Sequence, residues 1–311
     1  MYMFFVSALP VLLLMTGLSF VYQIFETKDI STDSLKYIGP MAVGFILIAA
    51  YKIGIKVVTD KLTLGLFFIG LFSTYFIRNA WIFPIVLLFG AIVSILSSKE
   101  SNLFNHVKLS PPWVYVIIFM GIILLGQLYL IGHQNKILNL FESFYRYGYL
   151  VFGGGQVVVP LMYTELVEIN SFMTNQEFLT GYGLVQGLPG PMFSFSAYAG
   201  GMAARGNGIL YQVLGALVGG IGIFLPGLLL IYFVYPIWEN LKGIKAIKVS
   251  LKGINAVAGG LITTSAIVLM QKNGFLVDNI IVCFITVLLL YSKKIPAPFI
   301  VLGSIVLGFI L

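Results

Sequence analysis

The chain consists largely of apolar runs that are too long and too numerous for a water-soluble protein. Hydrophobic residues make up 59% of its 311 residues and charged residues only 9%, whereas a soluble domain carries about 25% charged residues. Lipid accommodates helices that are hydrophobic on all sides, and a soluble core of this size does not. We therefore predict an all-α, multi-pass helical bundle in the plasma membrane and exclude a soluble enzyme.

The apolar runs fall into two groups. A span needs about 20 apolar residues, and five runs precede a polar joint at residues 133–136: Tyr2–Phe25, Tyr37–Val57, Leu62–Ile77, Ala80–Leu96 and Trp113–Gly132. Four more follow Pro226: Gly227–Trp238, Ile254–Met270, Phe275–Tyr291 and Ala297–Leu311. Between the groups, Gly and Pro clusters interrupt every hydrophobic stretch, which predicts broken or re-entrant helices.

The last four runs repeat the first four at an offset of 216 residues. This offset places Pro226 over Pro10, and Ser250-Leu251-Lys252 over Ser34-Leu35-Lys36. Internal repeats are typical of secondary transporters. We predict an incomplete first repeat (1–110), a connecting segment (111–136) and a complete second repeat (137–311). The first copy lacks a counterpart of Ile137–Gly222, so we expect about 80 residues of a longer protein to be missing before residue 1.

The basic residues predict opposite orientations for the two copies. Three successive loops carry four, one and two basic residues in the second copy, but two, three and one in the first. By the positive-inside rule, this reversal indicates an inverted repeat with the 60–61 and 239–252 loops in the cytoplasm. Chance variation of two charges is the alternative. The net charge of +7 fits such loops, and we do not interpret it as nucleic-acid binding.

Two clusters of Gly and Pro predict breaks at membrane depth, at 152–160 and at 181–191. Thr174 and Glu177 have the spacing of a capping box, so a helix is expected to begin at Asn175 and to stop before Pro189. That gives about 13 residues, or roughly 20 Å, which is too short to cross a core of about 30 Å. A second short helix is expected from Pro191 to Ala204, since Pro is favoured at the first helical position.

Such breaks favour anion binding. Free amides at a helix start point outward with the positive end of the dipole, and glycine lets the backbone approach a ligand closely. The candidate substrate-binding residues are Gly153, Gly154, Gly155 and Gln156 in the first cluster and Gln186, Pro189, Gly190 and Pro191 in the second. The alternative is that the glycines only permit close helix crossing, as we expect for Gly215 and Gly219.

The few charged residues near the breaks are the remaining candidates. Arg146 and Arg205 flank the clusters and would attract a dianion, or would serve as interfacial anchors. Glu165, Glu168 and Glu177 are candidates for proton coupling, because a carboxyl group in a low-dielectric site titrates toward physiological pH. Alternatively, Glu177 only caps its helix and the other two mark an interface.

The sequence offers no signal for a metal site, a cofactor or a catalytic nucleophile. No His, Cys or carboxylate cluster has metal-ligand spacing, and no nucleophile is paired with a base. The single cysteine, Cys283, lies in an apolar run and is interpreted as a packed side chain. We therefore predict a protein of the lipid bilayer that is not an enzyme and that works without a cofactor or metal. Whether it forms a homodimer is left open.

Several motifs together resemble the chromate transporter family. They are the Phe152-Gly153-Gly154-Gly155 cluster with Pro160, the run from Phe178 to Pro191, Phe224-Leu225-Pro226-Gly227 and Gly253-Ile254-Asn255-Ala256. The resemblance implies export of chromate, an oxyanion shaped like sulfate, driven by the proton or electrical gradient. It also implies two homologous halves in opposite orientation and places the functional motifs at Phe152–Gln156 and Gln186–Pro191. The family's own opening motif of the first half is absent here.

Three alternatives to chromate export stay open at this point. The same amide groups would accept sulfate or another inorganic anion in an uptake or exchange transporter. An anion channel would give flux that follows the gradient without saturation or coupling. A membrane scaffold that transports nothing is the third alternative.

Overall fold

The computed structural model describes residues 2–27, 33–77, 79, 81–100, 103, 110–132, 135–151 and 155–310. These residues form helices and no strand. Four segments are long and apolar enough to cross a membrane: Ser7–Phe25, Ile38–Val57, Ile209–Leu241 and Lys245–Asn273. The prediction of an all-α, multi-pass membrane bundle is therefore confirmed.

The first group of apolar runs forms five helices close to their predicted bounds. They are α1 (Tyr2–Thr27), α2 (Ile38–Val57), α3 (Lys61–Phe76), α4 (Ile82–Leu96) and α5 (Val114–Gly132). The rest of the chain forms α6 (Lys136–Tyr149), α7 (Val159–Tyr163), α8 (Asn175–Gln186), α9 (Phe195–Ala204), α10 (Ile209–Val234), α11 (Trp238–Leu241), α12 (Lys245–Asn273), α13 (Val277–Ser292) and α14 (Ala297–Ile310).

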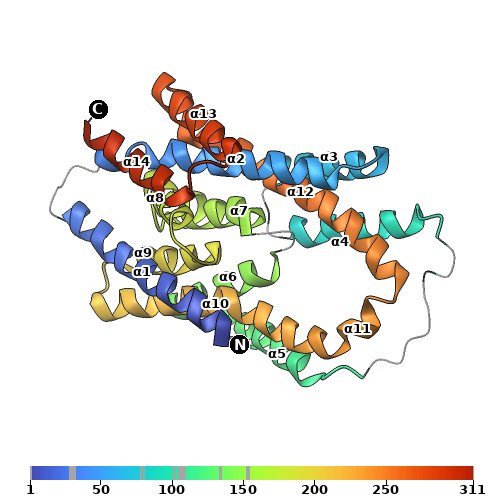
Figure 1. Cartoon of the computed structure of the whole chain (residues 1–311). Helices are drawn as coiled ribbons and strands as arrows, with labels where there is room; N and C mark the ends of the chain where they lie inside the picture. Colours follow the sequence, from blue (N-terminus) through green and yellow to red (C-terminus); the bar gives the residue numbers. More distant parts are fainter. Residues whose placement is uncertain are drawn as a thin grey trace.

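The helices are arranged in two groups with short helices between them (Figure 1). One group is centred on α12, which packs against α2, α3 and α4, while α13 packs against α2. The other is centred on α10, which packs against α5, α6 and α9. The short helices α7 and α8 lie between the two groups. This arrangement buries α7, α9 (Phe195–Ala204) and most of α8 inside protein, which is where interrupted helices are tolerated.

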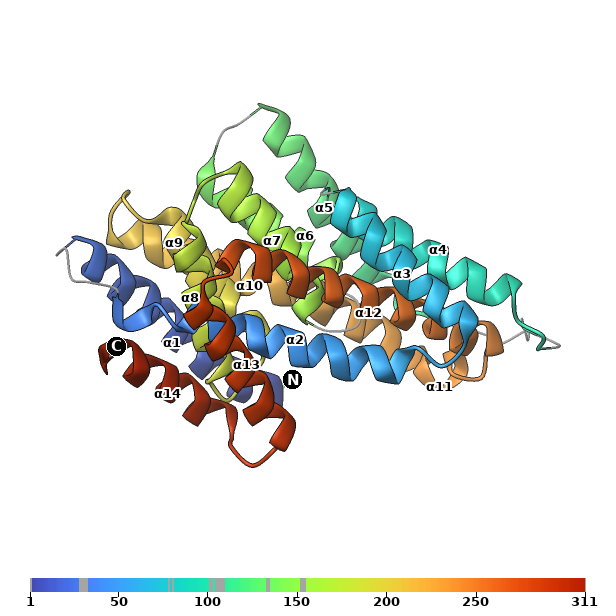
Figure 2. The same ribbon diagram turned by 90° about the horizontal axis from the view of Figure 1, so that it is seen from above.

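Helices α2 and α12 lie side by side and antiparallel (Figure 2). At one end, Gly39 of α2 lies beside Asn273 of α12. At the other, Lys252 of α12 forms an ion pair of 2.6 Å with Asp60, the residue that caps α3. We call these the Lys272 end and the Asp60 end of the bundle. The ion pair joins the two loops that the charge pattern assigns to the same side of the membrane.

Close helix crossings depend on glycine, as predicted for Gly215 and Gly219. A Cβ atom on Gly215 would clash with the backbone of Gly200, and one on Gly219 would clash with the backbone of Ser196. Small residues let α9 and α10 approach closely enough for their backbones to touch, which is how helices associate where lipid offers no hydrophobic driving force. These glycines hold the α9 and α10 backbones together.

One expectation was wrong. The sequence predicted interruptions as far as Pro226, but α10 runs without a break from Ile209 to Val234 and contains Pro226. The proline ring fits because Gly148 of α6 faces it, where a Cβ atom would meet the Pro226 Cγ. Transmembrane helices tolerate proline when neighbouring helices accommodate the distortion.

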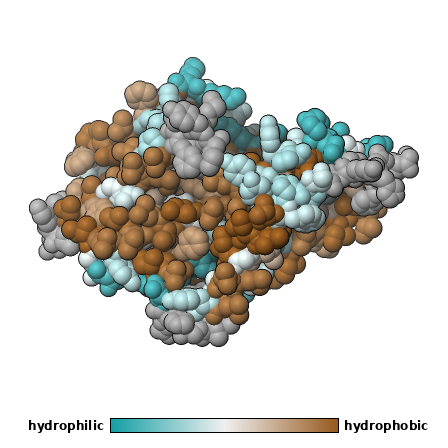
Figure 3. Space-filling view, turned by 90° about the horizontal axis from the view of Figure 1, so that it is seen from below, coloured by the Kyte–Doolittle hydropathy of each residue, from teal (hydrophilic) through white to brown (hydrophobic). Residues whose placement is uncertain are grey.

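The outer surface is strongly apolar. Large hydrophobic side chains that would be buried in a soluble protein are exposed on most of the long helices, for example Leu13, Leu88 and Leu217. Figure 3 shows hydrophobic residues over most of one face, with hydrophilic residues mainly toward its edges. A surface of this kind is stable against lipid chains and not against water.

Candidate substrate site at the tips of two hairpins

The first hairpin is built from α8 and α9. The predicted capping box is present: the Thr174 side chain accepts a hydrogen bond from the Glu177 N–H, and the Glu177 carboxylate accepts one from the Thr174 N–H. The helix α8 then ends at Gln186, and a 3₁₀ turn, η4 (Met192–Ser194), leads into α9. The first half-helix is therefore confirmed. The second ends at Ala204 as expected but begins at Phe195 and not at Pro191, because Pro191 is extended and a 3₁₀ turn follows it.

This hairpin enters and leaves at the Lys272 end. At its entry, Asn175 Nδ2 donates to the Lys272 carbonyl at 3.0 Å. At its exit, Arg205 forms a bidentate ion pair with the buried Glu177. A helix of 12 residues rises about 18 Å, which is too short to cross a bilayer core of about 30 Å. The hairpin returns to the end at which it begins.

A second hairpin lies beside the first. It runs inward along α6, turns, and returns through η2 (Gly155–Val157), α7 and a π-helical segment, η3 (Thr164–Ile169). Its return arm also finishes at the Lys272 end, where the Glu168 carboxylate pairs with the Lys272 ammonium at 2.7 Å. The turn contains the triple glycine, of which Gly153 and Gly154 lie outside the described residues. Gly155 and Gln156 are half-buried.

The tips of the two hairpins touch. A Cβ atom on Gly155 would come within 2.6 Å of the Met192 Cε and 3.3 Å of the Phe193 ring. A small cavity lies at this contact, lined by Gly155, Met192 and Phe193 together with Tyr182 and Ser196. The structure thus places Gly155 of the first predicted motif against Met192 and Phe193, which directly follow the second predicted motif.

The other predicted tip residues pack against neighbouring helices. Gly187 lies against Val301 of α14, and Gly190 lies against Val11 of α1, where a Cβ atom would be 2.5 Å from the Val11 Cγ2. Pro191 caps the 3₁₀ turn, and Pro189 is exposed. Gln186, at the end of α8, has a buried side-chain nitrogen without a hydrogen-bond partner among the described residues. Among the predicted residues of the second motif, Gln186 is thus the one whose side-chain amide N–H has no hydrogen-bond acceptor among the described residues.

Both candidate arginines are held by carboxylates. Arg205 pairs with Glu177 at the mouth of the first hairpin. Arg146 binds Glu165 through two hydrogen bonds of 2.6 and 3.1 Å and also reaches Glu142 at 3.1 Å. Neither guanidinium is therefore available to an anion in this conformation unless its ion pair opens. Their role in substrate binding stays a prediction.

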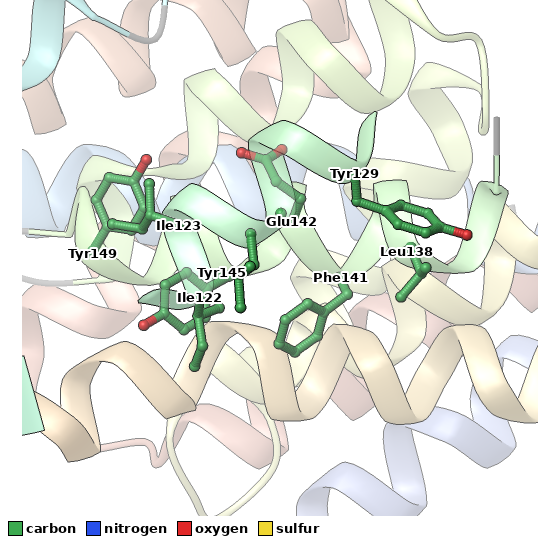
Figure 4. Close-up of a pocket in the computed structure, with 10 residues that line it drawn as sticks. Ile122, Ile123, Tyr129, Leu138, Phe141, Glu142, Tyr145 and Tyr149 are labelled. Atoms are coloured by element: carbon green, nitrogen blue, oxygen red, sulfur yellow. The ribbon is translucent and has the colours of Figure 1, made fainter. Parts of the chain in front are cut away.

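The Arg146 cluster extends into a groove between α5 and α6. The carboxylate of Glu142 accepts a hydrogen bond of 2.9 Å from Gln127 of α5, and Glu142 is among the ten residues that line this groove (Figure 4). Tyr147, which is fully buried, donates a 2.7 Å hydrogen bond to Glu165. With both carboxylates ionised, this cluster carries one more negative than positive charge. Glu142 was not singled out from the sequence.

The sequence analysis also missed the hydroxyl groups of the first hairpin. Tyr182, Ser194 and Ser196 are fully buried, and their hydroxyl oxygens have no hydrogen-bond partner among the described residues. The sequence does show that these three hydroxyl residues lie within five positions of Gln186 or Pro191, which places them near the second predicted motif. Their burial and lack of partners could only come from the tertiary structure.

These features define a multi-pass helical membrane protein in which two hairpins of short helices meet at their tips inside the bundle. The chain matches the sequence profile described as "Chromate transporter" over residues 1–95 and 138–309. It therefore belongs to the chromate transporter family. No solved structure matches it significantly.

Curated relatives cover nearly the whole chain. A "Chromate transport protein" of Cupriavidus metallidurans is 26% identical over 310 residues, which is 97% of this chain and 72% of the relative. An "Uncharacterized transporter" of Methanocaldococcus jannaschii is 26% identical over 99% of this chain and 75% of its own length. A "Chromate transport protein" of Pseudomonas aeruginosa is 30% identical over 138 residues, covering 44% of this chain and 31% of the relative. These names describe transport proteins and not enzymes.

Proposed function

We propose that this protein exports chromate, or a closely related oxyanion such as sulfate, across the plasma membrane as a secondary transporter. The observation that carries the proposal is the contact between the two hairpin tips at Gly155, Met192 and Phe193. Non-helical backbone survives at membrane depth only inside protein or beside a substrate path. Broken helices that meet near the membrane midplane are the usual substrate sites of secondary transporters.

An inverted repeat is the second part of the proposal. The offset of 216 residues carries the bounds of α3 onto 277–292, the bounds of α13. It also relates two helix contacts: Gly44 lies against the Cys283 carbonyl, and Gly260 lies against the Phe67 carbonyl. Reciprocal contacts of this kind are what a two-fold axis produces. Because α2 and its counterpart in α12 run antiparallel, such an axis inverts the two copies, and the division at 110 and 137 follows from it.

Proton coupling is assigned to the Arg146 cluster. Two carboxylates, Glu142 and Glu165, share a single guanidinium, and their side chains are each 14% exposed. Opening of the Arg146–Glu165 ion pair would free the guanidinium for an incoming dianion. Glu168 and Glu177 are less suited, because each has its own cationic partner.

The experiment measures chromate flux in proteoliposomes that contain the purified chain. We expect saturable flux that competes with sulfate and that changes when the proton gradient is collapsed. Flux that does not saturate would indicate a channel, and equal flux with and without the protein would refute the proposal.

Two glutamine variants connect the flux to the site. Gln186→Ala at the hairpin tip should lower the flux, because it removes a buried donor. Gln271→Ala is the matched control, because Gln271 is exposed and hydrogen-bonds Tyr75 outside the tip. Loss of flux in both variants, or in neither, would contradict the assignment of the tips as the substrate site.

A further inference from the structure

Buried hydroxyl groups in most helices of this protein form hydrogen bonds, but several in the α8–α9 hairpin do not. In other helices, Ser and Thr side chains donate to the carbonyl three or four residues earlier, as Thr286 does to Val282 and Ser304 does to Val301, both at 2.8 Å. This bond satisfies a hydroxyl group that has no water nearby. Among the described residues, seven buried side-chain polar atoms have no partner, and six of them belong to this hairpin: those of Asn175, Thr180, Tyr182, Gln186, Ser194 and Ser196.

Such a concentration of unpaired groups is costly unless it serves binding. A buried polar group without a hydrogen bond costs about 1–3 kcal/mol, so several in one hairpin oppose folding. Native proteins hold few such groups, and each one calls for an explanation. Gln186 lies one helical turn beyond Tyr182, and its amide is close enough to interact with the Tyr182 oxygen, which leaves the O–H of Tyr182 as a donor. The hairpin therefore keeps donors ready at a cost in stability.

Two of these groups line the cavity between the hairpin tips. Tyr182 and Ser196 are both 0% exposed, and both are among the residues that line the cavity beside Gly155. None of the described residues that line this cavity carries a charge. The cavity is therefore an uncharged, largely apolar space, with the two hydroxyl groups buried in its wall, between two elements that belong to the proposed substrate path.

We propose that the Tyr182 and Ser196 hydroxyls donate hydrogen bonds directly to the transported oxyanion, in a site that uses neutral donors in place of cations. The proposal rests on the proposed function and names the residues that bind. Hydrogen bonds to a charged group are about twice as strong as neutral ones, so the anion repays what the unpaired hydroxyls cost. A site without a fixed cation also releases a dianion more readily than a salt bridge does.

The cavity has to widen to accept the anion. Its volume is about 10 Å³, close to the minimum for a single water molecule. The Met192 thioether closes it on the side of Gly155, and a flexible methionine can move aside at little cost. The structure therefore represents a closed conformation in which the donors are already in place.

The test uses ligand-dependent thermal unfolding of the purified full chain in detergent, with sodium chromate and sodium sulfate as probes. Sodium chloride at equal ionic strength is the control. A ligand that binds only the folded state raises the unfolding temperature. We expect both oxyanions to protect the wild type, and Tyr182→Phe and Ser196→Ala to weaken their binding about tenfold or more, as loss of a hydrogen bond to a charged group does.

Two control variants separate binding from structure. Tyr198→Phe removes a fully buried hydroxyl of the same hairpin that donates to the Glu177 carbonyl at 3.1 Å. Ser304→Ala removes one that donates to Val301. Both control variants should lower the unfolding temperature of the ligand-free protein. They should not change the rise in unfolding temperature that chromate and sulfate cause. Without ligand, Tyr182→Phe and Ser196→Ala should unfold at or above the temperature of the wild type, because they remove unpaired groups.

The outcomes distinguish this inference from the proposed function. Wild-type protection by chromate and sulfate that Tyr182→Phe and Ser196→Ala retain in full would overturn the inference. Absence of any protection of the wild type would overturn it as well. Protection that depends on the two hydroxyls, together with absence of chromate flux in proteoliposomes, would leave the binding site standing and refute transport.

Discussion

The ion pair between Arg205 and Glu177 closes the mouth of the first hairpin, and we predict that it is a major source of the hairpin's stability. The Glu177 side chain is 4% exposed and the Arg205 side chain 20% exposed. Arg205→Ala leaves a buried carboxylate with one backbone hydrogen bond, from the Thr174 N–H at 2.6 Å, and no cation. Removing one partner of a buried pair costs about 3–5 kcal/mol.

Removing the carboxylate of this ion pair should cost less free energy of unfolding than removing the guanidinium. Glu177→Gln preserves the capping box, since glutamine serves at that position, and Arg205 retains enough exposure to reach water. The double variant Glu177→Gln/Arg205→Met leaves no buried charge, and methionine preserves much of the packing of the arginine stem. Replacing a buried ion pair by neutral groups is often close to neutral, so we expect the double variant to lie within about 1 kcal/mol of the wild type.

The unfolding free energies of the four proteins in detergent test both arguments. The expected order of stability is wild type and double variant together, then Glu177→Gln, then Arg205→Ala. A loss below about 1 kcal/mol for Arg205→Ala would refute the argument that Glu177 is buried and depends on this cation. A double variant as unstable as Arg205→Ala would refute the argument that an uncompensated charge is the cause.

Two further predictions concern helix packing and acid stability. Gly200→Ala should destabilise the protein by about 1–3 kcal/mol or more, because its Cβ atom would clash with the Gly215 carbonyl. Gly65→Ala is the control, because open space surrounds Gly65, and it should not destabilise the protein. Equal melting temperatures of the two variants would contradict this explanation. The hydrogen bond from Lys252 lowers the pKa of Asp60 from 3.8 to about 2, with help from Thr63. The stability from Asp60 is thus present above about pH 4 and lost as the pH falls toward 2, so Asp60→Asn should be slightly less stable at pH 6 and nearly equal to the wild type at pH 2. A difference in melting temperature that does not shrink toward pH 2 would contradict this explanation.

Local patterns were enough to predict most of the helices. The predicted end of the second run at Val57 and the predicted start of the last run at Ala297 agree with the ends of α2 and α14, because long apolar segments and their polar joints leave few alternatives. The capping box at Thr174 and the proline at position 189 fixed α8 for the same reason. Where the chain departed from expectation, at Pro226, the cause was a glycine of another helix, Gly148, which no local pattern reveals.

The candidate site could be predicted only in part. The two motifs were identifiable because Gly and Pro interrupt apolar sequence, and their contact at Gly155 and Met192 agrees with a shared site. The partners of the charged residues were not predictable, since Arg146 meets Glu165 and Arg205 meets Glu177 across 19 and 28 positions. Unpaired hydroxyl groups are defined by what surrounds them, so Tyr182 and Ser196 needed the packed structure.

The return of both hairpins to the end at which they begin has a consequence for topology. An element that goes in and comes back leaves the count of crossings unchanged, so α5 arrives and α10 departs on one side of the membrane. Every other helix would retain its direction if the hairpins were shortened, exchanged or rebuilt. The proposed substrate site can therefore vary in sequence while the orientation of the surrounding helices stays the same.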